Sequence, residues 1–356
     1  MFKQAAGQLL HGVRQQARDL DKGVQKVVEI IFPGPLGTSA GAWNAKLRDQ
    51  AAADVQRALA NWKRQEAAKR RKQGQLAARL ADQATVRMPL PAAPWSPKQL
   101  YYPKWMFGEW DVRATFVNFQ TPLGRKYVPE SALQAAESQV SAGGVGSSVT
   151  YKQRYFSTLP DTFANNLKVN LGILPNDAVI PDRAFNTKSN TDAFLGYDAV
   201  DTVQYDPRTA PGKESVTFKR SGRTGKALPP RRVELFINHL QSEDELAEAD
   251  ASGRLLGADQ FLTSEFYRQV LLGVQQVDVT DYEIITCFTR EADGHVTGRQ
   301  RSAVYLQPQD QLYFNALGRA VALYDYDLDM RRAPAPADAV GATACVQTPK
   351  DFVQCL

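Results

Sequence analysis

The feature that most constrains the fold of this chain is a change in the spacing of its apolar residues near Trp105. Before that point apolar residues recur every three to four positions, which is the spacing of one face of a helix. After it they alternate with polar residues, as in Glu109–Phe119, which is the spacing of a half-buried strand. The sequence therefore predicts a helical N-terminal part followed by a mainly β body.

Ten segments of the body are rich in aromatic and β-branched residues and are separated by Gly, Pro, Asn and Asp. The predicted strands are Glu109–Phe119, Ser148–Ser157, Asp177–Phe185, Val200–Tyr205, Ser215–Arg220, Arg231–His239, Phe261–Leu271, Val277–Thr289, Thr297–Leu306 and Ala320–Met330. About eight to ten strands with few helices indicate an antiparallel barrel or a sandwich. A closed barrel would leave no exposed strand edges.

The first predicted strand contains a change of phase. Trp110, Val112 and Phe116 alternate on one face, whereas Val117 and Phe119 fall on the other. An extra residue in one strand of a pair has this effect and bends the strand. The sequence therefore predicts a β-bulge or a barrel bend here.

Charge separates the chain into an arm and a body. Residues 1–98 carry 17 Lys and Arg against 7 Asp and Glu, and the remaining residues carry 26 against 31. The length of 356 residues fits about two domains. We expect a basic helical arm with a Pro-rich linker at 1–98, a barrel at 99–331 and a tail at 332–356.

The arm contains two predicted helices. Phe2–Val28 is amphipathic and resembles an organelle-targeting helix. The second helix, Ala40–Ala84, carries Trp43 and Trp62 on one apolar stripe and then a basic cluster. The basic cluster consists of Lys63, Arg64, Lys69, Arg70, Arg71 and Lys72. We interpret Trp43, Trp62 and the basic cluster as a docking surface for a protein complex or an anionic membrane, the alternative being a solvated helix face.

Several function classes lack their sequence signals. The longest apolar run, Val27–Pro33, is far shorter than the ~18 residues that span a bilayer. Three Cys and three His, without zinc spacing, predict no metal site. The chain has no phosphate-binding loop and no nucleophile motif, so we predict no catalytic residues and no cofactor apart from an apolar ligand. Without aromatic interleaving of the basic cluster, a nucleic-acid partner is disfavoured.

The candidate ligand-binding residues are Arg183, Phe185, Asn186 and Glu265. Arg183 could clamp an anionic head group at a barrel mouth. Alternatively, Asp182 and Arg183 point to opposite faces of a strand and Asn186 caps a helix that ends at Gly196. Glu265 is either an inward polar residue that tunes a cavity or a solvent-facing one.

Gly108-Glu-Trp110 opens the first strand and resembles the start of lipocalin-like barrels. The resemblance implies that Gly108 allows a tight turn and that Trp110 plugs the closed barrel end. In that fold a late arginine stacks on the plugging tryptophan, and Arg299, Arg301 and Arg319 are the candidates. These features favour the barrel over the sandwich.

Five motifs resemble an uncharacterised cyanobacterial and plastid family with a lipocalin-like barrel. They are Tyr102–Trp110, Pro181–Asn186, Thr263–Phe266, Leu306–Ala316 and Ala320–Leu328. The resemblance covers about residues 100–331 and implies a photosynthetic host and a chloroplast location, but no activity. Cys345 and Cys355 would then be a disulfide in an oxidising lumen or two thiols in a reducing stroma.

Two functions follow as expectations. The first is a non-enzymatic accessory or assembly subunit, docked by its basic arm on a thylakoid-associated photosynthetic complex or membrane. The alternative is a carrier of an apolar small molecule, such as a pigment, isoprenoid or lipid, inside the barrel. An enzyme acting on such a molecule is a third possibility, for which the sequence offers no catalytic set.

Overall fold

The computed structural model describes residues 75–81, 86–89, 98–158, 179–335 and 342–355, apart from short gaps at 131–132, 134–142, 208, 223, 226, 246–247, 250–254, 257–258, 274–276 and 352. These residues all belong to the second of two compact units, Gln73–Leu356. Trp43, Trp62, the basic cluster and the predicted helix Phe2–Val28 lie outside the described residues. No described helix is long and apolar enough to cross a membrane.

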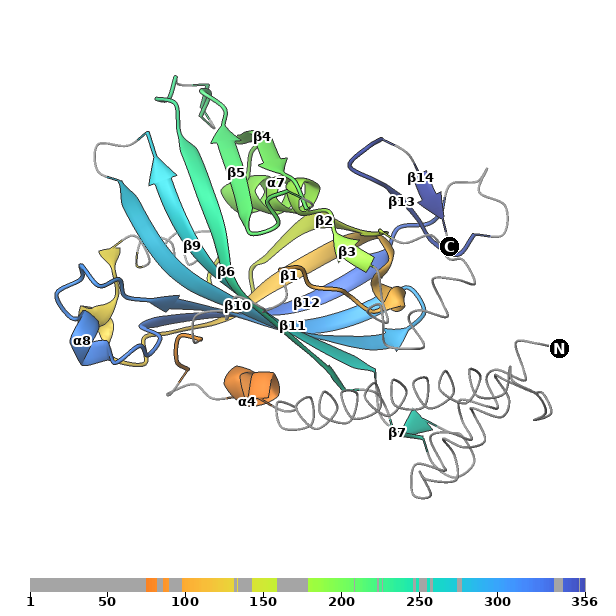
Figure 1. The fold of residues 1–356 in the computed structure, drawn as a ribbon, viewed down its shortest axis with the longest axis horizontal. Helices are drawn as coiled ribbons and strands as arrows, with labels where there is room; N and C mark the ends of the chain where they lie inside the picture. The colour runs from red at the N-terminus through yellow and green to blue at the C-terminus, as the bar shows by residue number, and fades with distance from the viewer. Residues whose placement is uncertain are drawn as a thin grey trace, which may run out of the picture. The chain divides into compact units, whose positions relative to one another are not determined.

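The body is built on one antiparallel sheet of ten strands (Figure 1), in the order β3-β2-β1-β12-β11-β10-β9-β6-β5-β4. The strands are β1 Gly108–Gln120, β2 Ser148–Ser157, β3 Val179–Pro181, β4 Val200–Tyr205, β5 Lys213–Phe218, β6 Arg232–Glu245, β9 Gln260–Leu272, β10 Asp278–Ala292, β11 His295–Tyr305 and β12 Ala322–Arg332. The prediction of a mainly β body is confirmed.

Short elements complete the described fold. They are the helices α4 Gln75–Ala81, α7 Arg183–Leu195 and α8 Tyr313–Ala316, the 3-10 turns η2 Lys104–Met106 and η3 Arg125–Tyr127, and the hairpins β7 Glu248–Ala249 with β8 Leu255–Leu256 and β13 Cys345–Gln347 with β14 Val353–Cys355. Of these, α7 lies between β2 and β4, near the two edges of the sheet (Figure 1).

The sheet is curled because its long strands contain bulges. The β1–β12 pairing shifts register between Phe116 and Asn118, so the predicted phase change in β1 is a bulge. A second shift lies in β6 between Ile237 and His239. Each bulge increases local twist and bends its strand, so the strands curve around a concave face.

The sheet is not closed by strand pairing, which corrects the expectation of a closed barrel. Its edges are β3 and β4, and α7 lies between β2 and β4 (Figure 1). The Asn186 side chain accepts from the backbone N–H of Arg154 in β2 at 2.7 Å and donates to its carbonyl at 3.1 Å. The Asp192 carboxylate accepts from the N–H groups of Ala199 and Val200, both at 2.8 Å. Side chains of one helix therefore satisfy backbone groups at both ends of the sheet.

The start of α7 also differs from the prediction. The strand predicted at Asp177–Phe185 ends at Pro181, and the helix cap is Asp182 rather than Asn186. The Asp182 carboxylate accepts from the N–H of Phe185 at 3.2 Å, which satisfies one of the free donors of the first turn. The predicted helix end at Gly196 is confirmed by its left-handed φ of 73°.

Trp110 fills one end of the concave face. Its ring is fully buried and its Nε1 donates to the carbonyl of Met106 at 2.8 Å. Gly108, with φ of 121°, allows the chain to enter β1 from η2. The guanidinium of Arg332 lies 4.9 Å from the Trp110 ring centroid.

The arginine that stacks on Trp110 was therefore predicted wrongly. Arg332 is the cross-strand partner of Trp110 in the β1–β12 register, so the two side chains lie on one face of the sheet. Arg301 instead binds Asp325 on the opposite face at 2.7 Å, and Arg319 donates to the carbonyl of Ala316.

Part of the N-terminal arm packs on the outer face of the sheet. Leu76 and Leu80 of α4 contact Leu262 and Ile285, and the partly buried Cys287 packs against the same cluster. Beside them Arg79 forms an ion pair with Glu283, whose carboxylate also accepts from Ser264 and Tyr305. A polar network and a small apolar cluster together fix α4 to the sheet.

The C-terminal tail docks at the Trp110 end. A disulfide joins Cys345 to Cys355 across the β13–β14 hairpin, which is the oxidised one of the two predicted states. The Gln354 side chain accepts from the N–H of Ser157 at 2.9 Å and donates to its carbonyl at 2.8 Å. Ala344 and Val346 join the same core as Trp110.

We predict that Trp110→Ala lowers the free energy of unfolding by about 3–5 kcal/mol, because it empties the best-buried large site of the concave face. Phe314→Ala is the control, since Phe314 is 77% exposed, and it should change stability by about 0.5 kcal/mol or less. Urea denaturation of both variants measures the difference. Equal stabilities of the two variants would contradict the role of Trp110.

Candidate functional site

The concave face of the sheet is rich in tyrosine. These side chains come from strands on both sides of the curl and from the segment before η2. They are Tyr102, Tyr151, Tyr155, Tyr205, Tyr267, Tyr282, Tyr324 and Tyr326. Phe194 of α7 lies 6.3 Å from Tyr151 and 5.9 Å from Tyr326 between ring centroids, so α7 covers part of this face. The helix that ends the sheet therefore also forms one wall of its interior.

The phenols on this face are neutral hydrogen-bonding groups. Burial raises the pKa of each of them, and that of Tyr326 reaches about 12. Among the described residues, the hydroxyls of Tyr151, Tyr282 and Tyr326 have no hydrogen-bond partner, and their oxygens are not among the fully buried unpartnered atoms, so they reach accessible space. Each can therefore donate to, or accept from, a bound molecule.

A charged cluster lies within the same interior. Arg183, in the first turn of α7, donates to both carboxylate oxygens of Glu265 in β9, at 3.2 and 2.5 Å. It also donates to the Tyr267 hydroxyl at 3.0 Å, and it lies 3.6 Å from Glu214 in β5. The side chains of Arg183 and Glu214 are 6% and 2% exposed. We call Arg183, Glu214, Glu265 and Tyr267 the interior cluster.

Burial and charge act in opposite directions in the interior cluster. Burial alone would lower the pKa of Arg183, but Glu265, Tyr267 and Glu214 raise it above its ordinary value. For Glu214, burial raises the pKa more than the 3.6 Å contact with Arg183 lowers it. Because Glu265 takes the two-pronged contact with Arg183, the charge of Arg183 is already offset by one carboxylate.

The structure brings together two of the four predicted ligand-binding residues. Arg183 and Glu265 form the ion pair, and Glu265 faces inward rather than towards solvent, with its side chain 13% exposed. Phe185 instead lies under the Arg154 guanidinium at 3.8 Å, and Asn186 binds the β2 backbone. The roles of Arg183 and Glu265 in binding stay predictions.

Sequence reasoning missed Glu214, Tyr267 and the unpartnered tyrosines. Glu265 and Tyr267 are two residues apart on one strand, so alternation alone places them on one face. Glu214 joins them because β5 pairs with β6 and β6 with β9. That proximity depends on strand order, which has no local sequence signal.

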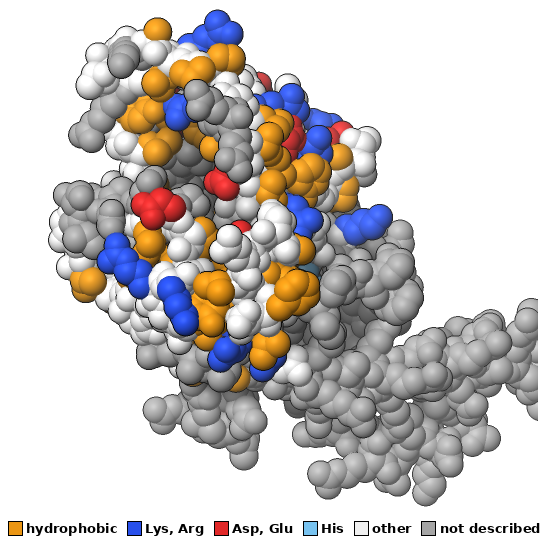
Figure 2. Space-filling view, turned by 90° about the vertical axis from the view of Figure 1, so that its left-hand side faces the viewer, with side chains coloured by type: hydrophobic (Ala, Val, Ile, Leu, Met, Phe, Trp, Pro, Cys, Tyr) orange, Lys and Arg blue, Asp and Glu red, His pale blue; other side chains and the backbone are white. Residues whose placement is uncertain are grey.

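No group of three or more His, Cys, Asp or Glu among the described residues could hold a metal ion. The interior cluster instead resembles the few polar groups that orient a ligand in a mostly apolar pocket. Figure 2, which views the molecule from the α8 side, shows hydrophobic side chains gathered in several patches, with a few acidic side chains between them.

A family described as a domain of unknown function matches residues 94–334, about two thirds of the chain. The chain belongs to the DUF6816 family. The predicted likeness to an uncharacterised family is thereby confirmed. No curated protein matches the chain, and no solved structure does.

The DUF6816 region contains all ten strands of the sheet, α7 and the whole interior cluster. Its last strand ends at Arg332, the partner of Trp110. By contrast, α4 and the β13–β14 hairpin lie outside it. The family domain therefore corresponds to the curled sheet together with the helix that bridges its edges.

We predict that Glu214 makes stability depend on pH. Its pKa in the folded protein lies above the ordinary 4.5, so the folded protein holds this proton more tightly than the unfolded chain does. The stabilisation is complete below that ordinary value and is lost as pH rises through the raised pKa. Glu214→Gln should flatten this fall.

Urea unfolding of the wild type and the variant, from about pH 4 to about pH 8, measures the effect. Glu291→Gln is the matched control, because Glu291 is an exposed carboxylate at the end of β10. Parallel pH curves for the wild type and Glu214→Gln would show that Glu214 does not hold the proton.

Proposed function

We propose that the protein is a non-catalytic carrier of an apolar small molecule, held between the concave face of the sheet and α7. The observation that carries the proposal is the unpartnered hydroxyls of Tyr151, Tyr282 and Tyr326 on an aromatic concave face. None of the three hydroxyl oxygens is among the buried atoms that lack a partner, so each reaches accessible space on the concave face. Hydroxyls that lack a partner in the protein and face inward can form hydrogen bonds with a bound ligand.

We further propose that the fold is lipocalin-like. Three features support this: the glycine at the entry to β1, the buried Trp110, and the Arg332 guanidinium over its ring. The departure from that fold is the use of α7, rather than strand pairing, to join the sheet edges. A helix at the seam could move without breaking a strand ladder, and it would then serve as the entry for the ligand.

The interior cluster favours a ligand whose polar end is neutral. An anionic head group, as first considered for Arg183, would compete with the two-pronged contact that Glu265 already makes. It would also lie near Glu214, within a site that carries two acidic side chains for one arginine. A hydroxyl or carbonyl accepts and donates hydrogen bonds without that repulsion. Pigments, isoprenoids and neutral lipids carry such groups.

All-trans-retinol and retinoic acid test this, because they share an isoprenoid body and differ in a hydroxyl against a carboxylate. We predict that retinol binds the full chain and quenches its intrinsic fluorescence. Retinoic acid should bind more weakly in the same titration. Glu265→Gln leaves Arg183 less neutralised and should shift the preference towards retinoic acid. Tyr326→Phe should weaken retinol binding about two- to tenfold, the value of one neutral hydrogen bond.

Tyr101→Phe is the control, because Tyr101 is 39% exposed and should leave both affinities unchanged. Failure of both probes to bind would overturn the carrier function. Binding of both probes with no effect of Glu265→Gln would retain a carrier but place the ligand away from the interior cluster.

A second function, docking through the basic arm, is also proposed. The observation that favours it is the attachment of α4 to the sheet, where Arg79 pairs with Glu283 and the Leu76 N–H donates to Glu243 at 3.2 Å. In the sequence, the basic cluster ends at Lys72, three residues before α4 begins. The expected partner is a thylakoid-associated complex or membrane in a chloroplast, as the sequence resemblance implies.

Charge reversal tests the docking function. The variant carrying Lys69→Glu, Arg70→Glu, Arg71→Glu and Lys72→Glu should lose most of its co-sedimentation with isolated thylakoid membranes, and salt should weaken the wild-type interaction. Lys98→Glu, a single change in the described part, is the control. If the fourfold variant co-sediments as strongly as the wild type, the basic cluster does not bind the membrane.

A further inference from the structure

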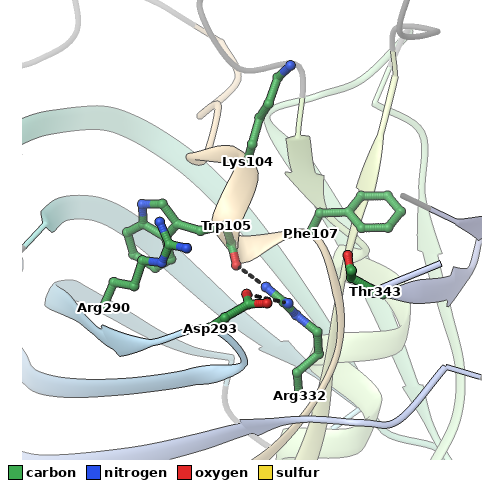
Figure 3. A pocket seen from close by; sticks show the side chains of 8 residues that line it. Lys104, Trp105, Phe107, Arg290, Asp293, Arg332 and Thr343 are labelled. Atoms are coloured by element: carbon green, nitrogen blue, oxygen red, sulfur yellow. Dashed lines mark hydrogen bonds and ion pairs between the residues drawn. The ribbon is translucent and has the colours of Figure 1, made fainter. Parts of the chain in front are cut away.

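A pocket lies at the Trp110 end of the sheet, away from the interior cluster. Its volume is about 310 Å³, which is within the range of small-molecule sites. Four segments that are distant in sequence converge on it (Figure 3): η2, the β10–β11 hairpin, the end of β12 and the residues before β13. The side chains or backbone that line it belong to Lys104, Trp105, Phe107, Arg290, Asp293, Arg332, Thr343 and Ala344.

Cationic groups outnumber acidic ones around this pocket, with Asp293 as the one carboxylate among the lining residues. Figure 3 shows the Lys104 ammonium pointing away from the centre, whereas the guanidinium groups of Arg290 and Arg332 lie beside it. The carboxylate of Asp259 lies 3.8 Å from Arg290, beyond hydrogen-bond distance. Two arginines therefore face the pocket with little acidic charge to offset them.

Arg332 is held rigidly in place. Its side chain is 10% exposed, its guanidinium lies over Trp110, and its Nη2 donates to the carbonyl of Trp105 at 2.7 Å. Its Nε is buried and has no partner among the described residues. Stacking fixes the plane of the guanidinium, so its remaining donors are preorganised for a planar or tetrahedral anion.

The carboxylate that Arg332 does bind is a weak competitor. Asp293 makes one contact to Nη1, at 3.0 Å, and its side chain is 67% exposed. An exposed ion pair of this kind contributes little, because water screens it and the side chain loses freedom. A free anion could take the place of Asp293 without unfolding the hairpin.

We propose that this pocket binds a small oxyanion, a carboxylate or a phosphate, between Arg332 and Arg290. The partly buried Trp105 supplies an apolar wall, so an oxyanion carried on a flat apolar body fits the lining better than a bare ion does. The bound anion would link the β10–β11 hairpin to η2 and to the residues before β13. This site is separate from the interior cluster and does not depend on the carrier function.

Benzoate and inorganic phosphate are the probes, titrated into the full chain by calorimetry in a low-chloride buffer. We expect saturable binding of at least one, with benzoate favoured if the apolar wall contributes. Arg290→Gln should weaken binding about fivefold or more, and Asp293→Asn should strengthen it, because it removes the competing carboxylate. Both substitutions leave the stacked Arg332 intact.

Arg331→Gln is the matched control. Arg331 precedes Arg332 on β12 and is 62% exposed, but it does not line the pocket. It should leave affinity unchanged, so a general effect of net charge is separated from an effect of the pocket. The proposal is overturned if neither anion binds at about 10 mM, or if Arg290→Gln and Arg331→Gln bind equally well.

Discussion

The hydrogen bonds between α7 and the two ends of the sheet are the interaction on which the rest of the structure depends. A ten-stranded antiparallel sheet that curls must either pair its edges or cover them, because exposed N–H and C=O groups invite association with other chains. Here Asn186 satisfies the backbone of Arg154, and Asp192 satisfies the backbone of Ala199 and Val200. One amide and one carboxylate, six residues apart on one helix, thus replace a strand pairing.

This arrangement explains why the charged groups are inside. Once α7 bridges the seam, its first turn projects Arg183 onto the concave face, where Glu265 and Glu214 lie. A buried arginine is costly unless it is paired, and the two-pronged contact with Glu265 meets that condition. The surrounding phenols remain neutral because burial raises their pKa. The result is an aromatic interior with a compensated charge pair and several unpartnered hydroxyls.

The local parts of this account could be predicted from the sequence, and the long-range parts could not. Alternation gave eight of the ten strands to within about three residues, and the phase change at Val117 gave the bulge. The stacking arginine was missed because Arg332 meets Trp110 only through the β1–β12 register. Asp182 was missed as the cap because the strand was extended too far. Glu214 was missed because its closeness to Arg183 depends on strand order and on the position of α7.

The most direct test is an experimental structure of the full chain purified natively without added ligand. The account predicts density for an apolar molecule between the concave face and α7, near Tyr151 and Tyr326, with Asn186 and Asp192 bound to the sheet edges. Edges that pair directly with each other, or an interior filled entirely by the chain's own side chains, would contradict it.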